Sequence, residues 1–284
     1  MFTWFREKHG FLQYVEQIKA YQLEVERYLS LQRKVPGYCS ACRRVRTFTV
    51  NSGVYMGDGP NLREGLVCEC GLSNRNRLIY LAISQEIDSD GECQVAILER
   101  TSVLFQKLKE KYPEIIGSEY VGEDVPSGSL HDMGGLQVRH ESITRLSFAS
   151  SSLDLIVHND VLEHVFEYRK AFDELYRVLK KGGRLIFTCP FLFMLDRELQ
   201  RARILEDGSI EFLMDPEYHG DPIRPQGVLT FYYFGWGLLD DLTQSGFSDV
   251  RLGVLYDPFS GFVSSNHPDY DYGNMLPIII RAVK

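Results

Sequence analysis

The sequence lacks any apolar run long enough to cross a membrane. Its longest, LIFTCPFLFML at 185–195, is too short and too interrupted to span a bilayer. The first ten residues, MFTWFREKHG, lack the apolar core and small-residue cleavage site of a secretory signal. We therefore expect a soluble, cytoplasmic protein with no membrane association.

The sequence also lacks an excess of positive charge. Its 31 Lys and Arg residues face 39 Asp and Glu residues, which gives a net charge of −8. This balance disfavours nucleic acid as a partner, because a phosphate backbone attracts basic surfaces. The charge is uneven, however: residues 31–80 carry +5 and the remainder carries −13.

Internal repeats and low-complexity segments are absent, and the hydrophobic fraction of 44% is that of an ordinary globular protein. The length of 284 residues suits one large domain, or a domain with an appendage. We expect three segments: an N-terminal helical segment at 1–34, a cysteine-rich, zinc-ribbon-like module at 35–80, and a main domain at 81–284. The helix, predicted over 11–34 from its apolar spacing and stopped by Pro36-Gly37, could cap the main domain or pair with a second copy in a homodimer.

Cysteine is scarce, and four of the six cysteines are grouped in two close pairs. Cys39-x-x-Cys42 and Cys68-x-Cys70 are separated by 25 residues. Two such pairs are what a tetrahedral structural zinc site requires, and a small loop-rich module gains folding free energy from a metal. The alternative is a set of reduced thiols. Cys93 and Cys189 are interpreted as core residues.

The stretch GLSNRNRL at 71–78 follows the second cysteine pair directly. Its residues Asn74, Arg75 and Arg77 could contact solvent, the acidic main domain or an anionic ligand. A nucleotide-linked sugar and a carrier-protein phosphopantetheine are candidate ligands, and nucleic acid is a third.

From residue 94 onward, short β-type runs alternate with helical patterns. Strands are expected at 94–98, 114–121, 136–140, 153–158 and 184–189, and helices at 102–112 and 168–179, with KKGG as a turn. A helix at 236–245 and strands at 247–256 and 276–283, forming a closing hairpin, complete the pattern. This alternation predicts a doubly wound, mostly parallel, seven-stranded sheet of the α/β class.

The stretch from Ser147 to Phe191 contains LDLIV, VLEHV and RVLKKGG in succession. It resembles the second half of class I S-adenosylmethionine-dependent methyltransferases, with Leu153 for the usual Phe and Lys181 for the usual Pro. The cysteine pairs, NLREGLVC and GVLTFYYFGW are similar to a bacterial subgroup that carries a short cysteine-rich segment before the methyltransferase domain. The resemblance covers about 94–284 and implies S-adenosylmethionine as cofactor.

The glycines that usually follow the first strand in this family are missing. Glu99 holds the acidic position, but Thr101, Val103 and Phe105 stand where three glycines are usual. The cofactor carries no phosphate, so a turn of small residues at 100–102 could serve. The subgroup's glycine motif is likewise weak.

The resemblance implies a cofactor site at the ends of the first four strands. Glu119 follows Glu99 by twenty residues, and an acid at that offset binds ribose hydroxyls. The expected cofactor-binding residues are Glu99, Thr101, Ser102, Glu119, Tyr120, Glu141, Ser142, Asn159 and Asp160. Asp160 could instead begin a helix through the capping box DVLE, and we expect His164 to be a buried structural histidine.

An insertion at about 191–235 is aromatic and rich in Pro and Gly, and it lies where this family builds its acceptor site. It holds Tyr218, His219 and Asp221 together. His219 is the expected general base, since its ordinary pKa suits proton transfer, and Asp221 could orient it.

Together these features predict a methyltransferase acting on a small or carrier-bound molecule, with oxygen as the expected acceptor atom. Two alternatives remain open. One is a non-catalytic binding or scaffold protein on a degenerate methyltransferase fold, and the other is an RNA methyltransferase that uses the basic module as its reader.

Overall fold

The computed structural model describes residues 1–50, 53–56, 59–87, 93–221, 224–270 and 273–284. The chain divides into two compact units. Unit 1 comprises Met1–Ile87, Leu192–Met194 and Arg251–Ile280, and unit 2 comprises Asp88–Phe191, Leu195–Val250 and Arg281–Lys284. The predicted segments 1–34 and 35–80 thus fall within one unit, and the predicted segment 81–284 contributes to both.

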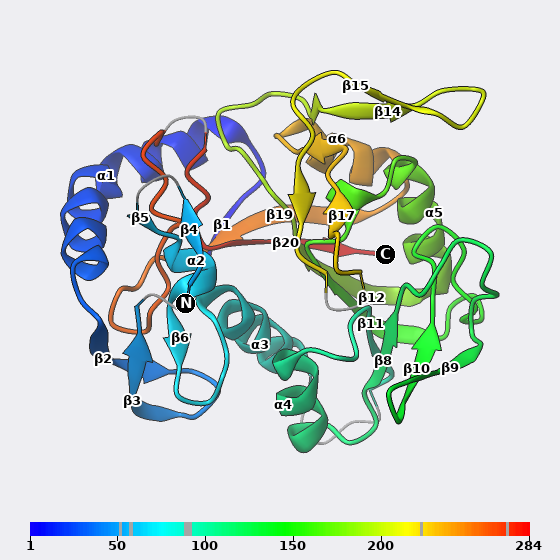
Figure 1. The fold of residues 1–284 in the computed structure, drawn as a ribbon, viewed down its shortest axis with the longest axis horizontal. Helices are drawn as coiled ribbons and strands as arrows, with labels where there is room; N and C mark the ends of the chain where they lie inside the picture. Colours follow the sequence, from blue (N-terminus) through cyan, green and yellow to red (C-terminus); the bar gives the residue numbers. More distant parts are fainter. Residues whose placement is uncertain (51–52, 57–58, 88–92, 222–223, 271–272) are drawn as a thin grey trace. The chain divides into compact units, whose positions relative to one another are not determined.

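Unit 2 is built on a sheet whose central strands are all parallel (Figure 1). Its order is β12 (Leu179–Thr188), β11 (Leu153–Asn159), β7 (Val95–Ile97), β8 (Ile116–Glu119) and β10 (Leu136–His140), with antiparallel β9 (Leu130–Met133) at the edge. β7 and β11 are almost wholly buried, as continuous apolar runs in a parallel sheet should be. The predicted doubly wound, mostly parallel sheet is confirmed, but among the described residues it has nine strands where seven were expected.

Two late strands extend this sheet beyond β12. β19 (Ser248–Val254) and β20 (Ile278–Val283) follow in the order β19-β20-β12, and residues 248–250 and 281–283 of them belong to unit 2. Lys284 exchanges two backbone hydrogen bonds with Gly182 and Gly183, of 2.8 and 3.0 Å. The two strands are neighbours as expected, but residues 255–277 separate them along the chain, so no tight turn joins them.

The turn expected at KKGG lies within β12 as an irregularity. Leu153 pairs with Leu179 and Leu155 with Arg184, so the four residues between Leu179 and Arg184 face a single residue of β11. Gly182 has φ +77°, a left-handed conformation that glycine adopts at little cost. The chain thus bends at KKGG as the glycines predicted, but β12 pairs with β11 both before and after the bend.

The helices of unit 2 are α4 (Val103–Lys111), the short 3₁₀ helix η1 (Leu162–His164), α5 (Tyr168–Val178) and α6 (Gly237–Gln244). Along α5, the residues that share the buried face recur at three- and four-residue steps: Tyr168, Ala171, Phe172, Leu175 and Val178. The capping box predicted at 160–163 does not begin an α-helix. One 3₁₀ turn, η1, follows instead, and Val161, not Asp160, holds its N-cap position.

The insertion after β12 folds into three small antiparallel pairs. These are β13 (Leu199–Gln200) with β18 (Tyr232–Tyr233), β14 (Ala202–Ile204) with β15 (Ile210–Phe212), and β16 (Tyr218–His219) with β17 (Val228–Leu229). Residues 222–223 of the insertion lie outside the described residues. The pairing of β16 with β17 sets the position of His219.

Unit 1 contains the N-terminal helix and the cysteine module. Its helices are α1 (Lys8–Ser30), α2 (Leu62–Gly65) and α3 (Asn74–Glu86), and its strands include β1 (Thr3–Phe5), β2 (Lys34–Cys39), β3 (Arg44–Thr49), β4 (Tyr55–Met56), β5 (Gly59–Pro60) and β6 (Val67–Cys68). β2, β3 and β6 form an antiparallel sheet, and β1 pairs with residues 252–254 of β19. A small core of Leu29, Phe48, Leu62, Leu66 and Val263 lies beneath the cysteines.

The predicted end of the N-terminal helix was wrong by four residues. α1 stops at Ser30, and Lys34 already pairs with Thr49 in the β2–β3 hairpin. Pro36-Gly37 therefore lies within a strand. Gly37 is required there, since a Cβ atom would approach the Phe48 ring to 2.5 Å.

One face of α1 is anchored within unit 1. The Glu26 carboxylate accepts a 2.8 Å hydrogen bond from the Ser264 backbone N–H, and it also bonds the Ser264 hydroxyl. Gln22 accepts a 3.0 Å bond from the Tyr270 hydroxyl. Elsewhere on the helix Tyr21, Leu23 and Tyr28 are exposed, and the homodimer expected through this helix stays a prediction.

In the described part of the chain, no helix combines the length and apolarity that a membrane crossing requires. The cytoplasmic location stays a prediction.

The stretch GLSNRNRL turns inward. Ser73 caps α3, and the guanidinium of Arg77 is fully buried, donating to the carbonyl oxygens of Leu66, Leu72 and Gly261 at 3.1, 2.9 and 3.0 Å. The Arg77 guanidinium also lies 4.3 Å from the centre of the Phe48 ring. Burial lowers the pKa of Arg77 to about 10, against the attraction of the nearby cysteine thiolates.

The other polar residues of this stretch are engaged as well. Arg75 contacts both oxygens of Glu64, at 2.7 and 3.1 Å, and Asn74 donates to the carbonyls of Leu62 and Val263. These residues therefore hold unit 1 together.

The contrast between Arg77 and Arg75 gives a stability prediction. Arg77→Met should lower the free energy of unfolding by about 3 kcal/mol or more, because three buried carbonyls lose charge-assisted donors. Arg75→Met should lower it by less than about 1 kcal/mol, since its ion pair is partly exposed. Urea denaturation followed by circular dichroism measures both. Equal losses of unfolding free energy would mean that the buried hydrogen bonds of Arg77 do not stabilise unit 1 more than the ion pair of Arg75 does.

Candidate functional site

The carboxyl ends of four adjacent parallel strands carry the predicted cofactor residues. β11, β7, β8 and β10 are neighbours in that order, so their ends lie along one edge of the sheet. Glu99 follows β7, Glu119 ends β8, Glu141 follows β10 and Asn159 ends β11. The structure thus brings these side chains to the same edge.

The turn after β7 is held by the Glu119 carboxylate. Its Oε1 atom accepts hydrogen bonds from the Arg100 and Thr101 N–H groups, both at 2.8 Å, and from the Thr101 hydroxyl at 2.7 Å. All three donors use one oxygen. Among the described residues, none donates a hydrogen bond to Oε2, which leaves that oxygen able to accept from a ligand.

Ser102 links this turn to the helix that follows. Its hydroxyl donates to Glu99 at 2.8 Å and accepts from the Phe105 N–H at 3.0 Å, as an N-cap does. The glycine-free turn is therefore closed by side-chain hydrogen bonds among Glu99, Thr101, Ser102 and Glu119.

After β10, the predicted residues differ in their accessibility. Glu141 is buried and accepts hydrogen bonds from Arg139 at 2.7 Å and from Ser147 at 2.8 and 2.5 Å. The Ser142 N–H donates to the Ser127 hydroxyl at 3.1 Å. These contacts give Glu141 a structural task, since they join the loop at 141–147 to the strand.

Tyr120 lies at the surface directly after β8. Its ring packs 5.4 Å from the ring of His140 and 5.1 Å from the guanidinium of Arg224, centre to centre. Arg224 also donates to the Tyr120 carbonyl at 3.3 Å. Because Arg224 belongs to the insertion, these contacts join the insertion to the carboxyl edge of the sheet.

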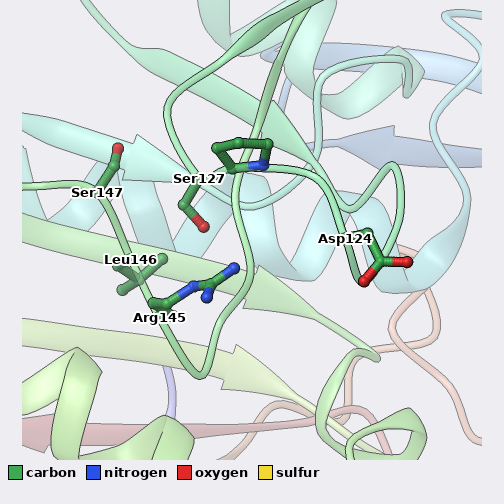
Figure 2. Close-up of a pocket in the computed structure, with 6 residues that line it drawn as sticks. Asp124, Ser127, Arg145, Leu146 and Ser147 are labelled. Atoms are coloured by element: carbon green, nitrogen blue, oxygen red, sulfur yellow. The ribbon is translucent and has the colours of Figure 1, made fainter.

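A shallow cavity of about 440 Å³ opens between the loops that follow β8 and β10. It is lined by Asp124, Pro126, Ser127, Arg145, Leu146 and Ser147. Figure 2 shows Ser127 and Arg145 on facing segments, with Asp124 farther along the first loop. The lining combines apolar carbons with a carboxylate, hydroxyls and a guanidinium, and sequence reasoning missed it.

At the end of β11, Asn159 and Asp160 share one partner. The Thr188 hydroxyl contacts the Asn159 side-chain oxygen and, at 2.7 Å, the Asp160 carboxylate. Asp160 has φ +50°, a conformation uncommon for a residue with a side chain and often found at functional sites. Thr188 on β12 thus orients both predicted residues.

The insertion places His219 beside two carboxylates. Its Nε2 atom lies 3.0 Å from Glu217 Oε1, and its Nδ1 atom lies 3.7 Å from Glu163 Oε1. The Nε2 atom of His164 lies 3.8 Å from the same Glu163 oxygen. The two imidazole rings meet edge to face with their centres 5.0 Å apart.

The carboxylates control the charge of His219. Burial opposes a charged ring, but the negative charge of Glu163 and the hydrogen bond to Glu217 outweigh it and raise the pKa of His219 to about 9. Bonding to His219 in turn lowers the pKa of Glu217 to about 2 against its own burial. The role of His219 as a general base stays a prediction.

The other two predicted catalytic residues point to different surroundings. Tyr218 is exposed, and Asp221 accepts hydrogen bonds from the Arg224 backbone at 2.7 Å and its guanidinium at 3.3 Å. The carboxylates next to His219 are Glu163 and Glu217, which sequence reasoning missed. The sequence LEH, which sets Glu163 beside a histidine at a strand end, was the available signal.

The four paired cysteines converge in unit 1. Their sulfur atoms all lie within 4.8 Å of one another, and Cys39 Sγ is 3.9 Å from Cys70 Sγ. Four thiolates at about 2.3 Å from a zinc ion lie about 3.8 Å apart, so the spacing fits a tetrahedral ion. Hydrogen bonding from Cys39 lowers the pKa of Cys70 to about 5, which favours the thiolate that metal binding needs.

Comparison with known proteins finds similarity over part of the chain. Residues 101–187, just under a third of the chain, match the family model of the methyltransferase domain.

A Malonyl-(acyl-carrier protein) O-methyltransferase 1 of Coxiella burnetii is 32% identical to this chain over 98 residues. That match covers 34% of the chain and 33% of the relative, so it spans about a third of the length of the curated protein.

Similar solved structures include two S-adenosylmethionine dependent methyltransferases. The one from Mesorhizobium loti is 14% identical with a TM-score of 0.44, and the match covers 73% of this chain and 98% of that one. The other, described as putative and from Listeria monocytogenes, is 13% identical with a TM-score of 0.45, covering 74% and 98%.

Proposed function

We propose that this protein transfers a methyl group from S-adenosylmethionine, which it binds at the carboxyl edge of the unit 2 sheet. The observation that carries this is the Glu119 carboxylate. It ends β8 beside the turn after β7, and one of its oxygens stays available. An acid at this position suits ribose hydroxyls, because a carboxylate accepts two donors from a diol.

The polar side chains at this edge suit the charged and hydroxyl groups of the cofactor. Glu99 and Asp160 are carboxylates that suit the ammonium group and the positive sulfonium, with Asn159 and the hydroxyls of Thr101 and Ser102 between them. The cavity bordered by Ser127 and Leu146 would take the adenine, next to Tyr120 and Ser142. When bound, the cofactor supplies an electrophilic methyl carbon, whose bond to sulfur breaks as its bond to the acceptor forms.

The acceptor would lie against the insertion, near His219 and Glu163. We propose a small or carrier-bound molecule methylated at oxygen. The similarity to the Coxiella burnetii relative, a malonyl-acyl-carrier protein O-methyltransferase, supports this, as does the contact of Arg224 with Tyr120 at the end of β8. His219, with Tyr218 and Asp221 on the same segment, would contact the acceptor.

The alternatives are less well supported. An RNA methyltransferase reading through the basic module would need free arginines, yet Arg75 and Arg77 bind within unit 1. A degenerate scaffold need not keep an acidic side chain at the end of β8 with an oxygen available to a ligand.

We further propose that Cys39, Cys42, Cys68 and Cys70 hold a structural zinc ion. The support is the sulfur spacing and the small apolar core beneath it, which alone would stabilise a loop-rich module weakly.

The cofactor proposal predicts a binding defect. Purified protein should bind S-adenosylhomocysteine with micromolar affinity in calorimetric titration, and Glu119→Ala should weaken binding at least about 10-fold, because a charge-assisted hydrogen bond to the ligand is lost. Glu114→Ala, at an exposed position before β8, is the matched control and should bind normally. A folded wild-type protein that does not bind would refute the enzyme proposal.

The zinc proposal predicts at least one equivalent of zinc in the protein purified under reducing conditions, as measured by elemental analysis. Cys39→Ser or Cys68→Ser should lose the metal and the thermal stability of unit 1, since metal binding contributes to folding. Cys93→Ser should keep both. Wild-type protein that is stable, folded and free of zinc would favour the reduced-thiol alternative.

A further inference from the structure

The Glu163 side chain is completely buried and lacks ordinary partners. Neither of its carboxylate oxygens has a hydrogen-bond donor among the residues that the structure describes. Two imidazole nitrogens face Oε1 at 3.7 and 3.8 Å, beyond hydrogen-bond length. A buried carboxylate without a donor is costly unless a positive charge offsets it, and either a protonated His219 or a cation bound between the three side chains would do so.

The outer nitrogen of His164 is held by a backbone carbonyl. His164 Nδ1 lies 2.8 Å from the Leu229 oxygen, and a carbonyl can only accept, so Nδ1 carries the hydrogen. The inner nitrogen, Nε2, then presents its lone pair toward Glu163. A backbone carbonyl that fixes the tautomer in this way is a usual support for a metal-binding histidine.

His219 is held in the same way by a carboxylate. Its Nε2 atom donates to Glu217 at 3.0 Å, and Glu217 is itself bound by the Tyr233 hydroxyl and by Arg201 at 3.1 Å. The inner nitrogen, Nδ1, faces Glu163. A carboxylate behind a histidine also recurs at metal sites, where it orients the ring and raises its basicity as a ligand.

We propose that Glu163, His164 and His219 bind a divalent transition-metal ion. Their ligand atoms lie within 4.8 Å of one another. Ligands about 2.0–2.2 Å from one ion are about 3–3.5 Å apart, so each side chain needs to move only by several tenths of an ångström. Two imidazoles and one carboxylate suit Zn²⁺, Fe²⁺, Mn²⁺ or Co²⁺ rather than Ca²⁺ or Mg²⁺.

Three protein ligands leave coordination positions open for a ligand from outside. His219 is about a third exposed, at 32% of its side chain, so the site can be reached. Glu163 follows the end of β11 by four residues, which sets the ion near the proposed cofactor edge. If the proposed methyltransferase function holds, the ion site defines the class of acceptor: a compound with a hydroxyl or carboxylate whose oxygen coordinates the ion. A coordinated hydroxyl loses its proton to water more readily, and its oxygen is then the stronger nucleophile.

The test must separate this site from the cysteines. Full-length protein with its cysteine site loaded with zinc is dialysed against Co²⁺, and both metals are counted. The absorption spectrum assigns the cobalt, because cobalt bound to thiolates adds strong sulfur charge-transfer bands that nitrogen and oxygen ligands do not give. Wild type should hold one zinc and one cobalt, the cobalt without thiolate bands.

Variants then identify the ligands. Glu163→Gln, which keeps the side-chain shape, and His219→Ala should weaken cobalt binding at least about 10-fold while the zinc stays. His9→Ala and Glu167→Gln, exposed residues outside the cluster, should match wild type. Thermal unfolding checks that each variant is folded.

Two results would overturn the inference. One is a wild type that takes up no cobalt beyond the cysteines. The other is cobalt retained by Glu163→Gln and His219→Ala, which would leave Glu163 as the counter-ion of a protonated His219. Titration with S-adenosylhomocysteine keeps the proposals separate: cobalt bound without cofactor binding would refute the methyltransferase proposal alone, and the reverse would refute the ion site alone.

Discussion

The hydrogen bonds that the Glu119 carboxylate accepts are the interaction on which the carboxyl edge of the unit 2 sheet depends. The carboxylate joins the end of β8 to the turn after β7 through three donors on one oxygen, and that turn leads into α4 through the Ser102 cap. A chain without glycines at this turn cannot rely on backbone freedom to shape it. The side-chain hydrogen bonds take over that task, and they leave the second carboxylate oxygen without a donor among the described residues.

Much of the fold was predictable because its signals are local. The apolar runs of β7 and β11 and the buried stripe of α5 follow from sequence spacing alone. The end of α1 was not, because Pro36-Gly37 looks like a stop signal but lies in a hairpin whose partner strand sets its conformation. The four-residue irregularity in β12 was likewise hidden, since it depends on the register with β11.

The site was predictable to the extent that strand order determines it. Glu119 could be found from its offset to Glu99, because neighbouring parallel strands end at one edge. The surroundings of His219 could not be predicted. Glu163 comes from η1, and His219 is brought to it by the short β16–β17 pair, which produces no recognisable hydrophobic periodicity in the sequence. From the sequence, Arg75 and Arg77 could contact solvent, the main domain or an anionic ligand. The pairing of Arg75 with Glu64 and the burial of Arg77 against backbone carbonyls are properties that only tertiary structure reveals.

Unit 1 has a consequence for the order in which the chain can fold during synthesis. Arg77 bonds the Gly261 carbonyl, Tyr38 bonds that of Phe259, and Glu26 bonds Ser264. These partners leave the ribosome nearly 200 residues after the cysteine module does. The N-terminal third must therefore wait, incompletely packed, while most of unit 2 is made, and a shortened chain that ends before residue 251 would present the buried guanidinium without one of its three acceptors.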